Sequence, residues 1–232
     1  MPRNAGVAAR RAGPSSLVVF FKAPGRAKRR LAAAVGSAAQ NAAEHLLACT
    51  LEDARGWTGD VFFAAAAEAD ARWLTRRSPR AGEVLVQRGD SLGERINRVD
   101  AQLRSRGIER LIYIGTDCPA IDHTYLARAD IALGRMDAVL GPALDGGVVL
   151  MGSRRPWPSI AKLAWSTPAL RAGLVDTLRG RGWTIQTLAA LRDIDRPQDL
   201  EAAADDLADD ARPARAALAA WLRSRQTRRA QP

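Results

Sequence analysis

The feature that most constrains the fold is a regular alternation of short apolar runs with longer stretches of helical pattern. The first run, 17–21, is apolar throughout, which is typical of a strand buried on both faces of a parallel sheet. Similar runs follow at 61–65, 83–87, 110–114, 137–141, 147–151 and 183–188, and helical patterns at 38–55, 68–77, 91–106, 123–133 and 168–180. This alternation predicts an α/β fold with a mainly parallel, mixed sheet flanked by helices.

Residues 17–208 are predicted to form one domain. The chain has 232 residues, which is more than one domain of typical size needs and less than two would occupy. Residues 1–16 have no periodicity and are expected to form a disordered basic arm. A helix at about 197–208 should end the domain, and 209–232 should form a C-terminal helix, about 213–225, with a basic tail.

The formal net charge of +10 is concentrated at the two ends of the chain. Residues 1–43 hold eight basic residues and 211–232 hold six, both without an acid, so 44–210 carry 21 basic residues against all 25 acids. A basic balance can indicate nucleic-acid binding. The sequence shows neither a regular series of aromatic residues for base stacking nor a known nucleic-acid module. We therefore do not expect a nucleic acid as the main partner.

The sequence also indicates where the protein is located. Its apolar runs fall well short of the ~18 residues that a membrane-spanning helix needs, and the first run stops at Lys22, too short for a signal-peptide core. Cys49 and Cys118 form no CxxC pair, and nothing suggests a secreted disulfide scaffold. A reduced, cytoplasmic protein without a membrane partner is expected.

In open α/β sheets, ligands bind outside the carboxyl ends of the strands, and a strongly basic segment follows the first predicted strand. Backbone N–H groups and cationic side chains at such a place favour a polyphosphate. If this loop is extended up to a helix that begins at Leu31, residues two apart share a side. Lys28 and Arg30 would then face the ligand and Arg29 the solvent. A solvated basic turn is the alternative, and the spacing of a P-loop is absent. The five cations are Lys22, Arg26, Lys28, Arg29 and Arg30.

Asp117 follows the fourth predicted strand within Gly-Thr-Asp-Cys-Pro. A carboxylate at the end of an apolar strand points into the ligand crevice, where it could hold Mg²⁺ (or Mn²⁺), a hard cation that prefers carboxylate and phosphate oxygens. The alternative is that Asp117 caps the next helix. Asp122 is better placed for that cap, which leaves Asp117 free.

Two later loops are compatible with more than one role. Residues 141–147 join two strands, and their glycines permit either close approach to a ligand or positive φ angles in a tight turn. Residues 193–200 form an acidic turn that enters a helix, for which Asp195 as the N-cap, followed by Pro197, is the simple explanation.

Six segments occur in an order that resembles one family over about residues 17–205. The chain is similar to the bacterial glycosyltransferase-like family of radical-SAM/selenodomain-associated transferases, which has the glycosyltransferase-A, or nucleotide-diphospho-sugar transferase, fold. The spacing from Lys22 to Lys28 also resembles that of 2-phospholactate guanylyltransferases, which belong to the same fold group. The segments are KAPGRAKRRLAAAVG (22–36), QRGDSLGERI (87–96), IGTDCPAI (114–121), LGPALDGGVVLMG (140–152), WSTP (165–168) and DIDRPQDL (193–200).

The resemblance implies roles in phosphate and metal binding. Lys22, Lys28 and Arg30 would contact the phosphates of a nucleotide, with Lys28 also taking part in catalysis. Asp117 would bind the metal and act in catalysis, and Asp195 would be the second metal ligand.

It also implies where the nucleotide and the acceptor lie. Asp145, with Gly146 and Gly147, would face a small-molecule acceptor, and Asp145 would be catalytic. The residues expected near the base or sugar of the nucleotide are Gly89, Asp90 and Ser91.

Two features depart from the family pattern. The first loop is two residues shorter than the family's KAPxPGxxKTRL, and Val148 and Val149 stand where the family has the two aromatic residues of DGGYYL. The residues that face the acceptor are therefore expected to differ from those of the family.

Three functions remain open from the sequence. The first is nucleotidyl transfer, in which a small acid, phosphate or phosphonate attacks the α-phosphorus of an NTP and displaces pyrophosphate. The second is sugar transfer from a nucleotide-diphospho sugar, with Asp145 as the candidate base. A single Asp after the fourth strand suits nucleotidyl transfer better than it suits sugar transfer. The third is a non-catalytic nucleotide- or nucleic-acid-binding protein.

Overall fold

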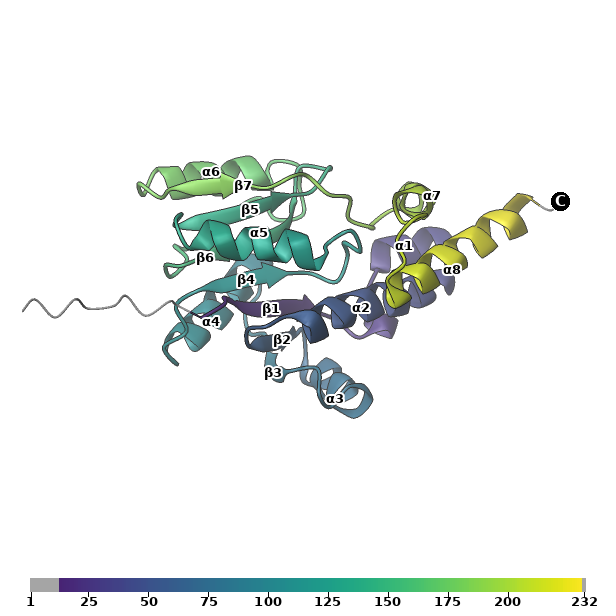
Figure 1. Cartoon of the computed structure of the whole chain (residues 1–232), viewed down its shortest axis with the longest axis horizontal. Coiled ribbons are helices and arrows are strands. Elements are labelled where there is room, and N and C mark those ends of the chain that lie inside the picture. The colour runs from purple at the N-terminus through teal and green to yellow at the C-terminus, as the bar shows by residue number, and fades with distance from the viewer. Residues whose placement is uncertain (1–12, 231–232) are drawn as a thin grey trace, which may run out of the picture.

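The computed structural model describes residues 13–230, and a seven-stranded sheet lies at its centre (Figure 1). The strands lie in the order β3-β2-β1-β4-β6-β5-β7. In the described chain β6 runs antiparallel to β4 and β5, and the other pairs are parallel. The predicted mainly parallel, mixed sheet is confirmed. The strands are β1 (Ser16–Phe21), β2 (Val61–Ala65), β3 (Glu83–Val86), β4 (Leu111–Ile114), β5 (Ala138–Pro142), β6 (Val148–Ser153) and β7 (Ile185–Thr187).

The expected helices form between and after these strands, and most differ from the prediction by one or two residues at their ends. The last helix is longer than expected and runs to Ala230 instead of ending near 225. A short helix also precedes the one expected at 38. The helices are α1 (Arg29–Val35), α2 (Ala38–Gly56), α3 (Glu68–Arg77), α4 (Leu92–Arg104), α5 (His123–Leu133), α6 (Leu170–Arg179), α7 (Pro197–Asp206) and α8 (Pro213–Ala230).

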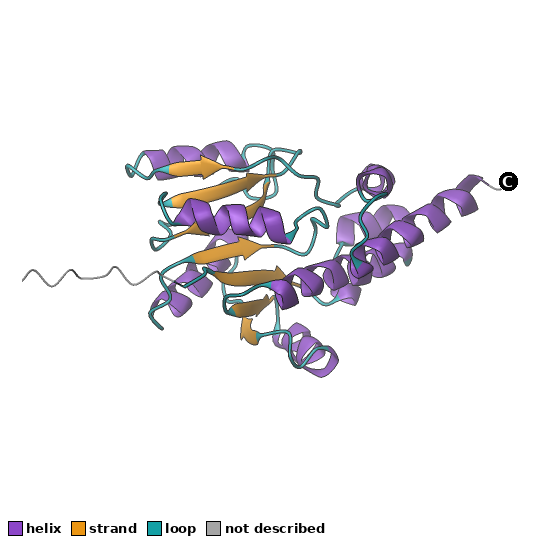
Figure 2. Ribbon diagram, viewed as in Figure 1, coloured by secondary structure: helices purple, strands orange, loops and turns teal. Residues whose placement is uncertain are grey.

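Helices cover both faces of the sheet, as Figure 2 shows. Leu17, Val19 and Phe21 of β1 pack in one core with residues of α2, α3 and α5, whereas Val18 packs in the other core with α4 and α6. Because successive side chains of a strand point to opposite faces, both sets of β1 residues must be apolar. This is why β1 has no polar alternation.

A third core lies among α1, α2, α7 and α8, beyond the carboxyl end of β1 (Figure 1). Leu46 of α2 packs there with Leu218 and Leu222 of α8, and all three side chains are buried. The C-terminal helix is therefore part of the folded body. Ile194, in the loop before α7, is also fully buried in this core.

The folded part of the chain begins earlier than the expected start at Leu17. Ser15 donates hydrogen bonds from its backbone N–H (2.8 Å) and its hydroxyl (2.6 Å) to the carboxylate of Asp130, and Ser15 and Ser16 are both buried. Residues 1–12 of the expected arm lie outside the described residues. Within 13–230, the helices are too short or too polar to cross a bilayer.

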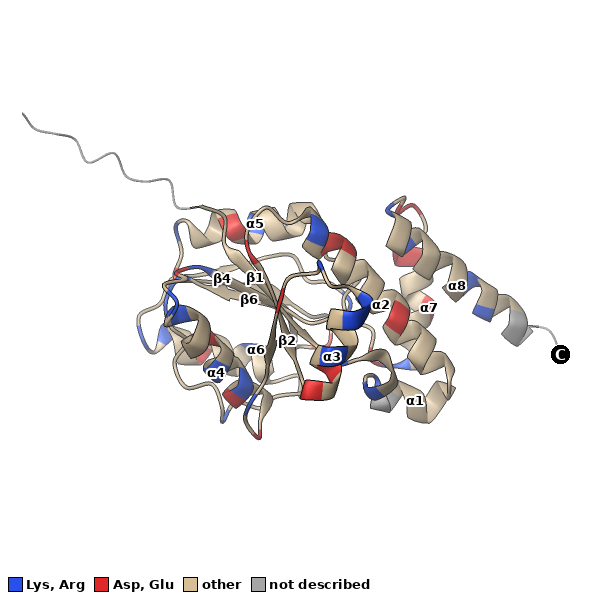
Figure 3. Cartoon of the chain, turned by 90° about the horizontal axis from the view of Figure 1, so that it is seen from below, with Lys and Arg blue, Asp and Glu red and all other residues tan. Residues whose placement is uncertain are grey.

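Charged residues are distributed unevenly over the molecule (Figure 3). Positive and negative residues stand side by side on α4, whereas α8 carries arginines and no acid. This agrees with the excess of basic residues at the end of the sequence.

Candidate active site

A cleft of about 460 Å³ opens at the carboxyl ends of β1, β2, β3 and β4. Its walls come from the segment after β1, the residues after β4, the start of α4 and the loop before α6. This is the edge of the sheet at which open α/β folds bind ligands. The charged residues that line it are Lys22, Arg26, Lys28, Arg95, Asp117 and Asp195.

Lys28 joins the two predicted metal ligands. Its Nζ lies 2.6 Å from Oδ1 of Asp117 and 3.0 Å from Oδ1 of Asp195, and it also donates to the carbonyl of Ile194. The lysine side chain is 4% exposed, whereas the two carboxylates are 47% and 40% exposed. The cation thus lies in the wall of the cleft, and both carboxylates keep oxygen atoms open to it.

The charge state of Lys28 follows from these contacts. Burial lowers the pKa of the ammonium, but the carboxylates of Asp117 and Asp195 outweigh burial and raise the pKa above its usual value. Lys28 is therefore protonated at neutral pH. It can stabilise negative charge, and it is not a general base.

The backbone at Lys28 differs from the expected extended loop. Lys28 has φ 55° and ψ 38°, and helix α1 begins at the next residue, Arg29, not at Leu31. Lys28 and Arg30 therefore do not lie in one extended loop, because Arg30 belongs to the helix, and the prediction that they share a side of such a loop is wrong. The side chain of Arg30 lies outside the described side chains, so its role in phosphate binding stays a prediction.

Two non-glycine residues within 13–230, Lys28 and Ser166 (φ 62°), have left-handed backbone. Both line the cleft. This conformation costs a residue with a Cβ atom on the order of 1–2 kcal/mol, and surrounding contacts must hold it in place. At Lys28 those contacts include the ion pairs of its buried ammonium with Asp117 and Asp195.

Asp195 reaches Asp117 because the chain after β7 crosses the ends of two other strands. Leu191 donates its N–H to the carbonyl of Pro142 (3.0 Å), beside the end of β5. The N–H of Ile194 then donates to the carbonyl of Asp117 at 2.8 Å, beyond the end of β4. The next residue, Asp195, is thereby placed at the cleft.

Helix capping leaves both carboxylates available. Asp122 accepts the N–H of Tyr125 at 2.6 Å and caps α5, as predicted, so Asp117 is not a cap. The proposed role of Asp195 as the N-cap of α7 is wrong. That cap is Arg196, and the carboxylate of Asp199 accepts the N–H groups of Asp195 and Arg196.

Asp193 is a further acidic residue of this region and was not among the predicted site residues. Burial, together with the negative charges of Asp145, Asp195 and Asp117, raises its pKa to about 6. The signal in the sequence was its position two residues before Asp195 in DIDRPQDL. Of these four carboxylates, Asp117 and Asp195 line the cleft, and their oxygens suit a bound hard cation.

The 143–147 loop forms a tight turn beside this cluster. Oδ1 of Asp145 accepts the N–H of Gly147 at 2.9 Å, and Gly146 has φ +94°. A Cβ atom on Gly146 would lie 2.5 Å from the carbonyl oxygen of Pro168, so the close neighbour of this glycine is another loop. Asp145 and its glycines do not line the cleft, although the charge of Asp145 acts on Asp193.

The predicted base-binding segment begins α4. Ser91 is the N-cap and accepts the N–H of Glu94 at 3.1 Å, while the carboxylate of Glu94 accepts the N–H of Asp90 at 3.0 Å. The predicted residues Gly89, Asp90 and Ser91 do not line the cleft. Arg95 does line it, and its Nε donates to the carbonyl of Gly89 at 2.8 Å. Arg95, one turn after the cap, was not among the predicted site residues.

Arg26 lies near a buried carboxylate at the start of α3. Asp70, at the start of α3, is fully buried, accepts the N–H of Ala23 at 3.1 Å and lies 3.5 Å from the guanidinium of Arg26. Asp70 therefore holds the backbone of the basic segment at Ala23, and it pairs with Arg26 by charge without a hydrogen bond. Nothing in the pattern of the sequence distinguished it from a residue of the solvated helix face.

The donor set fits a hard divalent cation. Asp117 and Asp195 offer carboxylate oxygens close enough to share one ammonium group, and Mg²⁺ commonly binds proteins through one or two carboxylates plus phosphates and waters. In the part of the chain that the structure describes, no group of three His, Cys, Asp or Glu is arranged to hold a metal alone. Phosphate oxygens and waters would therefore complete the coordination.

The fold matches that of solved structures. A Desulfovibrio desulfuricans protein assigned as a nucleotide-diphospho-sugar transferase has a TM-score of 0.82 and 24% identity over 93% of this chain and 96% of that one. CMP:2-keto-3-deoxy-manno-octonic acid synthetase, solved with CTP, has a TM-score of 0.52 and 15% identity over 85% and 100%. A Mycobacterium tuberculosis protein solved with manganese has 0.52 and 16% over 82% and 97%. The predicted nucleotide-diphospho-sugar transferase-like fold is confirmed.

Comparison with curated proteins gives no match. A family model matches residues 46–167, which is just over half of the chain and includes Asp117 but neither Lys28 nor Asp195. The association with radical-SAM proteins and the relation to 2-phospholactate guanylyltransferases stay predictions. The chain belongs to the DUF2064 family, which is described as an uncharacterized protein conserved in bacteria.

Proposed function

We propose that this protein is a metal-dependent transferase that uses a nucleotide, and that it transfers the nucleotidyl group of an NTP to a small phosphate, phosphonate or carboxylic acid acceptor. One observation carries the proposal. The buried ammonium of Lys28 lies between Asp117 and Asp195 at the carboxyl edge of the sheet. A cation and two open carboxylates at this place suit a metal-bound polyphosphate.

The other cations of the cleft support binding of the phosphates. Lys22, Arg26 and Arg95 lie around the same cleft, so that a triphosphate would meet positive charge from more than one side. Arg26 is about half exposed, and its guanidinium lies 3.5 Å from the buried carboxylate of Asp70. Its open side leaves donors available to a phosphate.

Asp117 and Asp195 would hold Mg²⁺ or Mn²⁺. When bound, such an ion polarises the phosphoryl oxygens and neutralises part of their charge. Asp193 and Asp145 add negative charge near this pair. Among the described residues, neither forms a hydrogen bond or an ion pair with Lys28.

In the proposed reaction an oxygen of the acceptor attacks the α-phosphorus of the NTP. The bond from that phosphorus to the bridging oxygen breaks, and pyrophosphate leaves with the bonding electrons. Lys28, which is protonated, stabilises the negative charge that develops on the phosphate oxygens. Because its side chain is held on three acceptors, little reorganisation is needed during the reaction.

Sugar transfer from a nucleotide-diphospho sugar is the second candidate. The likeness to the D. desulfuricans protein favours it. A sugar acceptor also needs a base, and Asp145, whose charge acts on Asp193, is the candidate. The leaving group would then be a nucleoside diphosphate.

The test is to incubate the protein with each NTP or nucleotide sugar, with Mg²⁺ or Mn²⁺ and a panel of acceptors. Release of pyrophosphate supports nucleotidyl transfer, and release of nucleoside diphosphate supports sugar transfer. If the protein neither turns over nor binds any of these nucleotides in calorimetry, while it binds nucleic acid tightly, the transferase proposal is wrong and the binding-protein alternative stands.

A further inference from the structure

We propose that Arg215, on the C-terminal helix α8, is a positioning residue that fixes the backbone carrying Asp117. Its consequence for turnover rests on the proposed function, but its effect on the backbone does not. Arg215 lies outside residues 46–167, the part of the chain that the family model matches.

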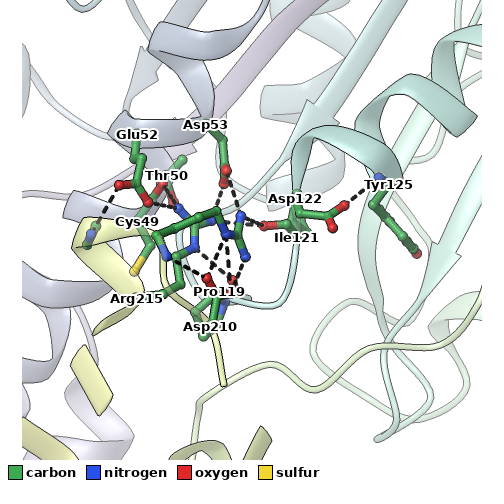
Figure 4. Close-up of polar contacts among 12 residues, drawn as sticks. Cys49, Thr50, Glu52, Asp53, Pro119, Ile121, Asp122, Tyr125, Asp210 and Arg215 are labelled. Carbon is green, nitrogen blue, oxygen red and sulfur yellow. Dashed lines mark hydrogen bonds and ion pairs between the residues drawn. The ribbon is translucent and has the colours of Figure 1, made fainter. Parts of the chain in front are cut away.

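The guanidinium of Arg215 is fully buried and uses its whole donor set (Figure 4). Nε donates to the carbonyl of Pro119 at 3.1 Å, and Nη2 donates to the carbonyl of Ile121 at 2.8 Å and to the carboxylate of Asp53. Nη1 donates to the carbonyl of Cys49 at 2.6 Å and to Glu52 at 2.8 Å. Five acceptors thus meet the five N–H donors of an arginine.

These acceptors belong to two different parts of the fold. Cys49, Glu52 and Asp53 lie on α2, which packs against the sheet, whereas Pro119 and Ile121 lie in the irregular segment between β4 and α5. One side chain from α8 therefore ties this segment to a helix. Loss of any one of these acceptors would leave a buried N–H group of Arg215 unpaired, so the position of each acceptor matters for stability.

A second arginine, directly before the first residue of α8, reinforces the contact. Nη1 of Arg212 lies 3.2 Å from the carbonyl of Ile121 and 3.2 Å from the carboxylate of Asp53. The carbonyl of Ile121 thus accepts from both arginines. Burial raises the pKa of Asp53 to about 6, while the two arginines favour its ionised form.

The held segment is the one that positions Asp117. Pro119 is two residues beyond Asp117, and between β4 and α5 the chain has no helix or strand to fix its path. The carbonyl of Asp117 accepts the N–H of Ile194, and its carboxylate meets Lys28. A shift of the segment would therefore alter both the Asp117 carboxylate and its distance from Asp195.

Arg215→Lys is the informative variant. Lysine keeps a positive charge beside Glu52 and Asp53, but its three donors cannot reach all five acceptors. Arg223→Lys is the matched control, because Arg223 lies on the same helix with an exposed side chain. Arg215→Met would leave Glu52, which is 23% exposed, and Asp53, which is 5% exposed, without their main partner and serves as the extreme case.

The primary readout is amide hydrogen exchange, which needs no substrate. In Arg215→Lys the amides of Ile194 and Ile121, which donate to the carbonyls of Asp117 and Cys118, should exchange at least about tenfold faster, while Phe63 in β2 keeps its wild-type rate. Arg223→Lys should change none of these rates. If Ile194 and Ile121 keep wild-type protection, or if all three amides change by the same factor, the positioning role is refuted.

The second readout is the Mn²⁺ concentration that gives half-maximal turnover. It should rise about tenfold to a hundredfold in Arg215→Lys, as for residues that orient metal ligands. An unchanged Mn²⁺ requirement together with faster exchange at Ile194 would show that the segment moves without affecting the site, which overturns the inference. A wild-type protein without turnover counts against the proposed function alone, since the exchange comparison still decides whether Arg215 holds the segment.

Discussion

Lys28 and Asp117 form an ion pair in which the cation is 4% exposed and the carboxylate 47% exposed, with Nζ and Oδ1 2.6 Å apart. The pair joins the segment after β1 to the segment after β4, two neighbouring strands of the sheet. The cation belongs to the protein wall, and the open side of the carboxylate is what a ligand would meet.

Asp117→Asn should remove most of the activity and leave the fold intact. The amide keeps the shape of the side chain but loses the charge that a metal and Lys28 require. Loss of a charge-assisted contact costs roughly 1.5–3 kcal/mol, so turnover should fall about tenfold to a hundredfold. The measurement is the rate against Mg²⁺ concentration. The control is Asp205→Asn, because Asp205 is an exposed residue on α7. Full Mg²⁺-dependent turnover in Asp117→Asn would refute the assignment of Asp117 as a metal ligand.

Lys28→Ala should lower kcat by about tenfold to a hundredfold with a smaller effect on KM, because the ammonium acts on charge that develops in the reaction. The resemblance assigns no phosphate contact to Arg29, so Arg29→Ala should change either parameter by less than about threefold. Arg30→Ala should mainly raise KM for the nucleotide, because a planar guanidinium binds ground-state phosphates. Steady-state kinetics checks all three. Should Arg29→Ala be the most damaging, the assignment of this loop is wrong.

Removal of residues 226–232 should leave turnover nearly unchanged, whereas removal of 213–232 should abolish it. The shorter deletion keeps Leu218 and Leu222 in the third core and keeps Arg215. The longer deletion loses all three and exposes the apolar faces of α2 and α7. Thermal unfolding and turnover measured on both truncations check this. Equal turnover of the two proteins would mean that α8 contributes nothing to the site.

Removal of residues 1–14 should likewise leave turnover nearly unchanged, since the match to the family pattern begins later in the chain. Any affinity of the full chain for nucleic acid should be weak and should fall steeply with salt. Tight, sequence-selective binding that survives ~0.2 M salt would favour the third function over a transferase.

Asp137 should stabilise the protein in a pH-dependent way. Its carboxylate accepts the N–H and the hydroxyl of Thr184, each at 3.0 Å, and contacts Arg154. The hydrogen bond from the Thr184 N–H, helped by the hydroxyl and Arg154, lowers its pKa below the usual 3.8. Because the folded-state pKa is lowered, the stabilisation is present above pH ~4 and is lost as the pH falls through the folded-state pKa.

The measurement for Asp137 is Tm as a function of pH for the wild type and Asp137→Asn. The wild type should have the higher Tm at pH ~7, and the difference should shrink below pH ~4. Asp176 is an exposed residue of α6, and the Tm difference between the wild type and Asp176→Asn should not change with pH in this way. A Tm difference that stays constant down to pH ~2 would show that the charge of Asp137 is not its source.

The sequence by itself determined the strands, most helices and one of the central site residues. Leu17–Phe21 had to be a doubly buried strand because it carries no polar position, and Asp122 had to be the cap because it directly precedes the helical pattern. Those two facts placed Asp117 free at a strand end. Each depends on neighbours along the chain, and local patterns report such neighbours well.

Only the tertiary structure decided which distant residues complete the site. Asp195 looks like a helix cap in the sequence, and it reaches Lys28 because the chain after the edge strand β7 crosses the ends of β5 and β4. Arg215 looks like one more basic residue of a tail, yet it is fully buried because its acceptors come from α2 and from the segment after β4. The burial and partners of a polar side chain depend on residues far away in sequence, and no local pattern encodes them.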